Sequence, residues 1–248
     1  MALINSCEKS GNWLFRHRGE LPVILFLAAI PVVYLTDTYY LPDKAKHILT
    51  FIAVFLSVLG FVIRAIAIGT TPKGTSGRNT KEGQVAESLN TKGIYSMVRH
   101  PLYLGNYFMW IGIVLFTLNF SFVVIVSLLF WLYYERIMFA EERFLEQKFG
   151  SDYTTWAGRT PAFIPCFRKY EKNEMPFSFK NVFKREYSGM LATVIGFVFI
   201  DDLRRFFDFQ YFSWKTTAHY MLLAAIAIAF ILRSLKHYTR VFDEEGRA

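Results

Sequence analysis

Gly93-Ile-Tyr-Ser-Met-Val-Arg-His-Pro-Leu-Tyr-Leu-Gly105 is the stretch that decides how this chain is organised, because a polar, glycine-rich segment meets a long apolar run there. Pro101 lacks a backbone N–H and therefore fits the first turn of a helix, which places His100 near the N-cap. The unpaired N–H groups at a helix start favour an anion. The stretch is therefore either the start of a ligand-binding helix or a basic anchor at a membrane interface.

The composition is that of a membrane protein. The 248 residues are 53% hydrophobic and only 19% charged, and the apolar residues come in long blocks. The net charge is +8, but the basic residues lie between these blocks, which indicates an anionic membrane surface as the partner and argues against nucleic acid. Two cysteines, Cys7 and Cys166, provide neither a disulfide framework nor a metal site.

Apolar blocks along the chain predict an all-α, polytopic membrane protein with about six spanning helices. The blocks are residues 21–36, 45–70, 102–118, 120–134, 187–200 and 218–232. An even number of spans places both termini on one side. Lys and Arg are dense in the links on that side, so the positive-inside rule predicts that the termini and the 93–105 motif are cytoplasmic.

The blocks divide the chain into three parts. Residues 1–44 hold a polar segment, with a short interfacial helix expected near Trp13, and the first span. Residues 45–166 hold the motif, and residues 167–248 hold a charged linker and two further spans. Glycine and proline predict a loop over residues 71–90. Arg64, near the end of the second block, is expected to extend toward the headgroups.

A second informative feature is the Glu141–Glu142 pair. At about 100° per residue, Glu141 falls in the middle of an apolar helix stripe and Glu142 at its edge. A carboxylate there is costly without a partner, which is either an arginine that pins the helix or a cationic ligand. The hairpin of the two preceding blocks brings this pair beside the start of the 93–105 helix. A zwitterion such as the amino-acid moiety of S-adenosylmethionine suits that combination.

Two motifs, in order and at this spacing, resemble the isoprenylcysteine carboxyl methyltransferase family of integral membrane methyltransferases and, more loosely, the phospholipid methyltransferases. The first is Gly93-x-Tyr-x-x-Val-Arg-His-Pro-x-Tyr-x-Gly105. The second begins at Glu141-Glu-x-x-Leu and continues through Phe149-Gly-x-x-Tyr-x-x-Trp-x-x-Arg-Thr-Pro161. The likeness covers roughly residues 50–165. It implies a helical membrane fold, S-adenosylmethionine in a cytosolic pocket, and a lipid or lipidated methyl acceptor that enters from the bilayer.

The resemblance also implies roles for single residues. The expected cofactor-binding residues are Arg99, His100, Tyr103, Gly105, Glu141 and Glu142. Arg159 corresponds to a family arginine near the acceptor, where it would orient an anionic group, and Glu142 is the second expected catalytic residue. An acceptor that is already an anion needs little acid–base help, so positioning and desolvation would supply most of the rate.

Other functions stay open at this level. Membrane sterol reductases that use NADPH carry a related Arg-His-Pro-Asn-Tyr signature, although Leu102 stands here in place of the Asn. A phospholipid N-methyltransferase is a further alternative, and the acceptor can be a prenylated cysteine carboxylate, a phospholipid amine or a lipid phosphate. A non-catalytic anchor protein is disfavoured, because it has no need of Glu141 on an apolar stripe.

Overall fold

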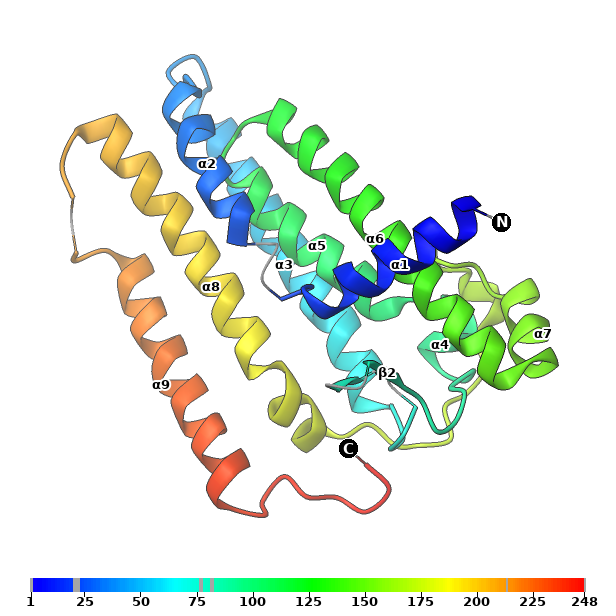
Figure 1. Cartoon of the computed structure of the whole chain (residues 1–248). Coiled ribbons are helices and arrows are strands. Elements are labelled where there is room, and N and C mark those ends of the chain that lie inside the picture. Colours follow the sequence, from blue (N-terminus) through cyan, green and yellow to red (C-terminus); the bar gives the residue numbers. More distant parts are fainter. Residues whose placement is uncertain (1, 20–22, 76–77, 81–82, 213, 248) are drawn as a thin grey trace.

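The computed structural model describes residues 2–19, 23–75, 78–80, 83–212 and 214–247, and these are predominantly helical. Long helices run side by side in alternating directions (Figure 1). They are α2 (Val23–Leu35), α3 (Asp43–Gly69), α5 (Pro101–Leu115), α6 (Phe120–Phe149), α8 (Phe179–Phe209) and α9 (Thr217–Tyr238). Each contains the core of one predicted apolar block, so the predicted all-α polytopic fold is confirmed.

Shorter elements complete the described chain. They are α1 (Ala2–Arg16), α4 (Ile94–Met97), α7 (Ser151–Arg159), a 3-10 turn (Phe167–Lys169) and the antiparallel strands β1 (Arg78–Thr80) and β2 (Gly83–Val85). The strands lie in the predicted 71–90 loop, of which residues 76–77 and 81–82 are outside the described residues. Because the long helices alternate, residues 2–19, 70–75, 78–80, 83–100, 150–178 and 239–247 lie at the same end of the molecule, called here the polar end (Figure 1).

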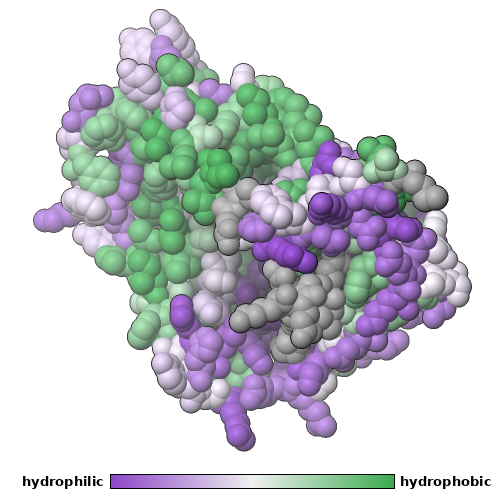
Figure 2. All heavy atoms as spheres, viewed as in Figure 1, coloured by the Kyte–Doolittle hydropathy of each residue, from purple (hydrophilic) through white to green (hydrophobic). Residues whose placement is uncertain are grey.

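Three helices of the described chain, α3, α6 and α9, are long and apolar enough to cross a membrane. Helices α2 and α5 are apolar but shorter. Helix α8 has 31 residues, but it carries charged side chains toward both of its ends. Figure 2 shows an apolar surface over part of the visible face, and hydrophilic side chains gather at the opposite part. This segregation fits a bundle embedded in lipid with its polar end in water.

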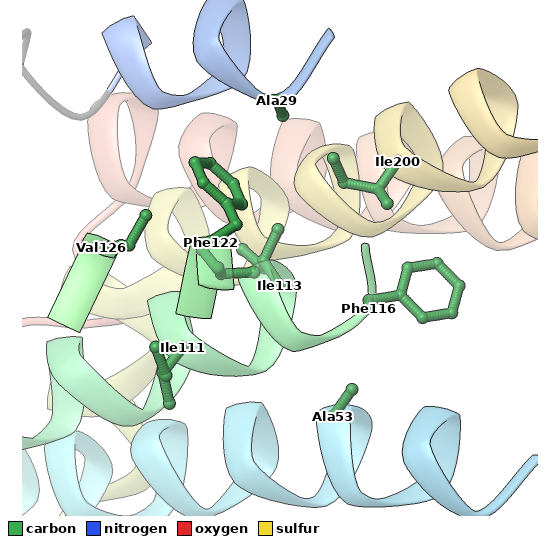
Figure 3. Close-up of a cluster of buried hydrophobic side chains, with 9 residues drawn as sticks. Ala29, Ala53, Ile111, Ile113, Phe116, Phe122, Val126 and Ile200 are labelled. Atoms are coloured by element: carbon green, nitrogen blue, oxygen red, sulfur yellow. The ribbon is translucent and has the colours of Figure 1, made fainter. Parts of the chain in front are cut away.

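A cluster of buried apolar side chains holds five of the helices together. Figure 3 shows Ala29, Ala53, Ile113, Phe122 and Ile200, which come from α2, α3, α5, α6 and α8 respectively. Helix α9 lies outside this cluster and packs mainly on α8. The core therefore joins α8, from the predicted C-terminal part, to the helices that carry the motifs.

Helices α3 and α5 approach each other backbone to backbone. A Cβ atom on Gly105 would lie 2.8 Å from the carbonyl oxygen of Gly60, and one on Gly60 would lie 2.6 Å from the backbone nitrogen of Met109. The Ser57 hydroxyl donates to the Met109 carbonyl at 2.9 Å. Gly105 thus permits close packing of two helices.

We expect Gly60→Ala to destabilise the protein by about 1–3 kcal/mol, because the new methyl group meets backbone atoms that cannot move away independently. Thermal unfolding in detergent would measure the change. Gly158→Ala is the matched control, since no atom outside its immediate chain neighbourhood lies within 4 Å of a Cβ at that position. Equal melting temperatures for the two variants would contradict the close contact.

Helix α1 is longer than the predicted short interfacial helix and packs across α6 (Figure 1). Phe15 is 1% exposed and contacts a buried cluster that includes Tyr103, Tyr134 and Ile137. The Arg18 guanidinium stacks over the Phe15 ring at 4.1 Å from its centroid. The N-terminal segment therefore forms part of the structure around the motif.

Candidate active site

A cavity of about 360 Å³ opens at the polar end. Its walls come from α3, the segment after β2, the α4–α5 corner, α6, α7 and α8. The lining side chains used below are Arg64, Asn90, Tyr95, Arg99, His100, Tyr103, Asn106, Glu141, Tyr153, Arg185 and Glu186. This set mixes charged groups of both signs with aromatic rings, which is typical of a site for a polar ligand.

The α4–α5 corner begins as the sequence predicts. Pro101 occupies the first turn of α5 and His100 is the N-cap residue. The backbone N–H groups of Arg99 and His100 donate to the carbonyls of Pro161 and Ala162 at 2.9 and 3.1 Å. The chain segment after α7 is therefore fastened to the start of α5, which brings the two sequence motifs together.

Arg99 connects three elements. Its Nε and Nη2 donate to the two Glu142 oxygens at 2.9 and 3.1 Å, and its Nη1 donates to the carbonyls of Ala157 and Thr160 at 2.8 and 2.6 Å. The His100 Nε2 lies 2.8 Å from Glu142 Oε1. Both Glu142 oxygens are thus engaged within the protein, and Glu142 fixes α6 to the corner from behind the cavity wall.

Glu141 has a different environment. Its Oε2 is buried without a hydrogen-bond partner among the described residues and lies 3.8 Å from the Nδ1 of His100. Two more buried polar atoms on this cavity, the Nδ2 of Asn90 and the Oη of Tyr153, also lack partners within the described chain. Buried polar atoms are rarely left unpaired, since each costs about 1–3 kcal/mol. Their convergence on one cavity indicates a binding site for a polar ligand.

Two tyrosines of this wall remain protonated at neutral pH. Burial, helped by the charge of Glu141, raises the pKa of Tyr95 to about 12. Burial, together with the charge of Glu142, also raises the pKa of Tyr153. Both hydroxyls therefore stay neutral and can donate hydrogen bonds to a ligand.

The inner wall contains a buried ion pair that the sequence did not reveal. Arg64 Nε and Nη2 donate to the Glu186 oxygens at 2.7 and 2.6 Å, and Nη1 donates to Asn106 Oδ1 at 2.6 Å. Their side chains are 19% and 3% exposed. The expectation that Arg64 extends toward the headgroups is wrong, because a carboxylate on α8 holds it inside. Glu186 stands beside an apolar block in the sequence, and no local pattern marks it as a site residue.

The predicted site residues divide into three groups. Arg99, His100, Tyr103 and Glu141 line the cavity, and the ring of Tyr103 stacks on that of His100 at a centroid distance of 5.6 Å. Glu142 supports two of these from behind. Gly105 and Arg159 are not among the cavity-lining residues. Gly105 lies at the α3–α5 contact. The side chain of Arg159 is 56% exposed and lies 3.8 Å from Glu171.

Comparison with known proteins supports the expected family. A family model described as phospholipid methyltransferase matches residues 48–152. Protein-S-isoprenylcysteine O-methyltransferase from Tribolium castaneum is 28% identical over 141 residues, which is 56% of this chain and 50% of the relative. Residues 48–152 of this chain are thus similar to membrane methyltransferases, including those of the isoprenylcysteine carboxyl methyltransferase family. The matched domain comprises α4, α5, α6 and most of α3, but not α8 or α9.

Other relatives match this chain over similar or shorter stretches. Protein-S-isoprenylcysteine O-methyltransferase B from Arabidopsis thaliana is 26% identical over 134 residues, covering 53% of this chain and 68% of the relative. The cobalt-zinc-cadmium resistance protein CzcN from Cupriavidus metallidurans is 35% identical over 88 residues, covering 36% and 40%. The chain spans about half the length of the Tribolium relative. No solved structure matches at a significant level.

Proposed function

We propose that this chain transfers a methyl group from S-adenosylmethionine to an anionic oxygen of a lipidated acceptor in the membrane. The observation that carries the proposal is the buried Glu141 oxygen without a partner among the described residues, which faces a cavity lined mainly by the segment that matches the methyltransferase family model. The relatives named as protein-S-isoprenylcysteine O-methyltransferases favour the carboxylate of a prenylated cysteine as the acceptor.

The cavity residues fit the methyl donor. Glu141 would accept hydrogen bonds from its ammonium group, and the hydroxyl of Tyr153 and the amide of Asn90 would donate to its polar atoms. His100 and Tyr103 form an aromatic wall beside them. When bound, S-adenosylmethionine supplies a methyl group on a positively charged sulfur, and transfer to a carboxylate yields an ester and a neutral thioether without releasing a proton. The cavity therefore needs groups that position and desolvate the acceptor more than it needs a base.

The polar end, with the site and both described chain ends, is proposed to face the cytoplasm. The density of Lys and Arg in the segments at this end supports that orientation. Cys166 lies at this end, and after Cys7→Ser it is the remaining cysteine. Thiol labelling of Cys166 in intact cells and in inside-out vesicles would test the orientation. Labelling by an impermeant reagent in intact cells would contradict it.

Calorimetry of the purified full chain in detergent tests the donor first. We expect saturable binding of S-adenosylhomocysteine and none of NADPH. The reverse result would favour the reductase alternative. Methyl transfer to a prenylated cysteine, a phospholipid amine and a lipid phosphate would then identify the acceptor class, and activity on the amine alone would favour a phospholipid N-methyltransferase.

Arg159→Ala tests the expected catalytic arginine. Because Arg159 is exposed and pairs with Glu171 outside the cavity, we expect the variant to keep its affinity for S-adenosylhomocysteine and to retain most of its turnover, within about threefold. Complete loss of turnover with intact donor binding would instead support the role near the acceptor that the family resemblance implies for Arg159. Steady-state methylation kinetics and calorimetry on the same preparation provide both measurements.

A further inference from the structure

The chain segment after α7, residues 162–171, lies along the α4–α5 corner. Backbone hydrogen bonds fasten it there, because the Cys166 N–H donates to the Met97 carbonyl and the Gly93 N–H donates to the Glu171 carbonyl, each at 3.0 Å. Three large apolar side chains of the same segment, three positions apart, are instead exposed. The exposed fractions are 80% for Ile164, 76% for Phe167 and 57% for Tyr170. Exposed apolar side chains that recur in this way indicate an interaction surface.

The beginning of this segment lies at the level of the membrane boundary. The ring of Phe163 packs against those of Trp131 and Tyr107, at centroid distances of 5.6 and 6.2 Å. Trp131 belongs to the apolar part of α6 and is 46% exposed, so in a bundle embedded in lipid its exposed part faces the bilayer. The charged residues of α6 begin at Glu135, about one helical turn further on. The surface that meets the exposed side chains of the segment is therefore the membrane interface.

A cavity of about 370 Å³ lies beside the same segment and is called here the basic pocket. Its charged lining residues within the described chain are Arg159, Arg168, Lys169 and Glu171. The carboxylate of Glu171 is also paired with the ammonium group of Lys92 at 2.6 Å. Positive charge is therefore in excess in the basic pocket, which complements an anionic group.

The basic pocket and the polar cavity of the candidate active site are neighbours. Trp156 lines both of them and is 5% exposed. Its indole N–H donates to the Tyr95 carbonyl at 3.1 Å, which fixes the ring between the two spaces. A ligand in the basic pocket would thus leave the polar cavity free for the methyl donor.

We propose that the basic pocket binds the headgroup phosphate of an anionic phospholipid, with Ile164, Phe167 and Tyr170 inserted beside it into the membrane interface. The lipid is held as a component of the structure and is not the methyl acceptor. A zwitterionic phospholipid fits less well, because its own ammonium group meets the excess positive charge. Since the pocket is at the surface, added salt weakens the attraction.

Calorimetric titration of the full chain in an uncharged detergent tests the pocket. The probes are short-chain phosphatidylglycerol, phosphatidylcholine of the same chain length, and glycerol 3-phosphate. We expect phosphatidylglycerol to bind more tightly than the other two. Arg168→Gln/Lys169→Gln should weaken its affinity by about tenfold to thirtyfold at low ionic strength, the effect expected for two basic groups near an anionic surface.

Lys9→Gln/Lys148→Gln is the matched control, because it removes the same charge from exposed positions at the polar end. Its affinity for phosphatidylglycerol should stay within about twofold of that of the unmodified chain. An equal loss in both double variants would show a response to net charge alone and would overturn the proposal. Equally tight binding of glycerol 3-phosphate would also overturn it, by showing a site for soluble phosphate esters.

The depth of the segment in the membrane is tested with a nitroxide label at Phe167→Cys. The label is placed in a Cys7→Ser/Cys166→Ser chain in nanodiscs that contain phosphatidylglycerol, and a label at Lys148→Cys serves as the control. We expect oxygen to reach the first label more readily than a water-soluble nickel complex does, and the reverse at the control position. Equal access of the nickel complex to both labels would contradict insertion. Neither measurement depends on methyl transfer.

Discussion

Glu186→Ala is expected to destabilise the protein by about 3–5 kcal/mol, because it leaves the Arg64 guanidinium buried without its carboxylate partner. The pair is bidentate, at 2.6 and 2.7 Å, and Glu186 is almost fully enclosed. Asn106 would still accept one hydrogen bond but cannot balance the charge. Thermal unfolding in detergent, followed by tryptophan fluorescence, measures the loss.

The double variant Arg64→Met/Glu186→Met distinguishes an unpaired charge from general damage to the core. Replacing both partners by apolar side chains removes the uncompensated charge, so we expect much of the stability to return. Glu146→Ala breaks an exposed pair with Arg143 and should cost less than about 1 kcal/mol. An equally small loss for Glu186→Ala would show that the buried pair is not formed.

Glu141→Gln is expected to weaken S-adenosylhomocysteine binding by about tenfold to a hundredfold, since a hydrogen bond to a charged group contributes about 1.5–3 kcal/mol. The unliganded protein should not lose stability and should gain some, because the variant removes a buried carboxylate oxygen that has no partner within the described chain. Calorimetry and thermal unfolding of the same preparation measure both effects. A binding residue that lowers the stability of the free protein is expected at a functional site.

Glu142→Gln, one position along the same helix, is the matched control. Its carboxylate pairs with Arg99 and His100, so we expect a lower melting temperature in the absence of ligand. The two neighbouring variants should therefore shift stability in opposite directions. Unchanged donor affinity in Glu141→Gln, with a melting temperature lowered as in Glu142→Gln, would make Glu141 a structural residue.

The apolar blocks predicted the long helices because burial in lipid depends on the residue type alone, and Pro101 marked the start of α5 because its chemistry restricts it to a first turn. The sequence did not show which residues, far apart along the chain, form ion pairs in the folded protein. The partner of Arg64 lies 122 positions along the chain, on a helix that begins inside the predicted linker. Local sequence cannot tell a guanidinium that reaches the headgroups from one held in the interior.

The structure shows where each candidate site residue lies, and most of them come together around one cavity. Glu141 and Glu142 are adjacent and chemically identical, yet one faces the cavity and the other supports the corner, because a helix turns them toward different neighbours. A glycine such as Gly105 permits close approach by either a ligand or another helix, and here the neighbour is α3. Arg159 is exposed at the end of α7, and the segment after it forms backbone hydrogen bonds with the start of α5.

The backbone-to-backbone contact of α3 and α5 also limits which parts of the molecule can move. We expect these two helices to move together as one unit. Separating them would expose the glycine faces and break the hydrogen bond between Ser57 and Met109. Helix α9 packs chiefly on α8 and shares no part of the buried cluster in Figure 3, so its displacement would leave that cluster intact. The α3 and α5 walls of the polar cavity, in contrast, are fixed to each other by this contact.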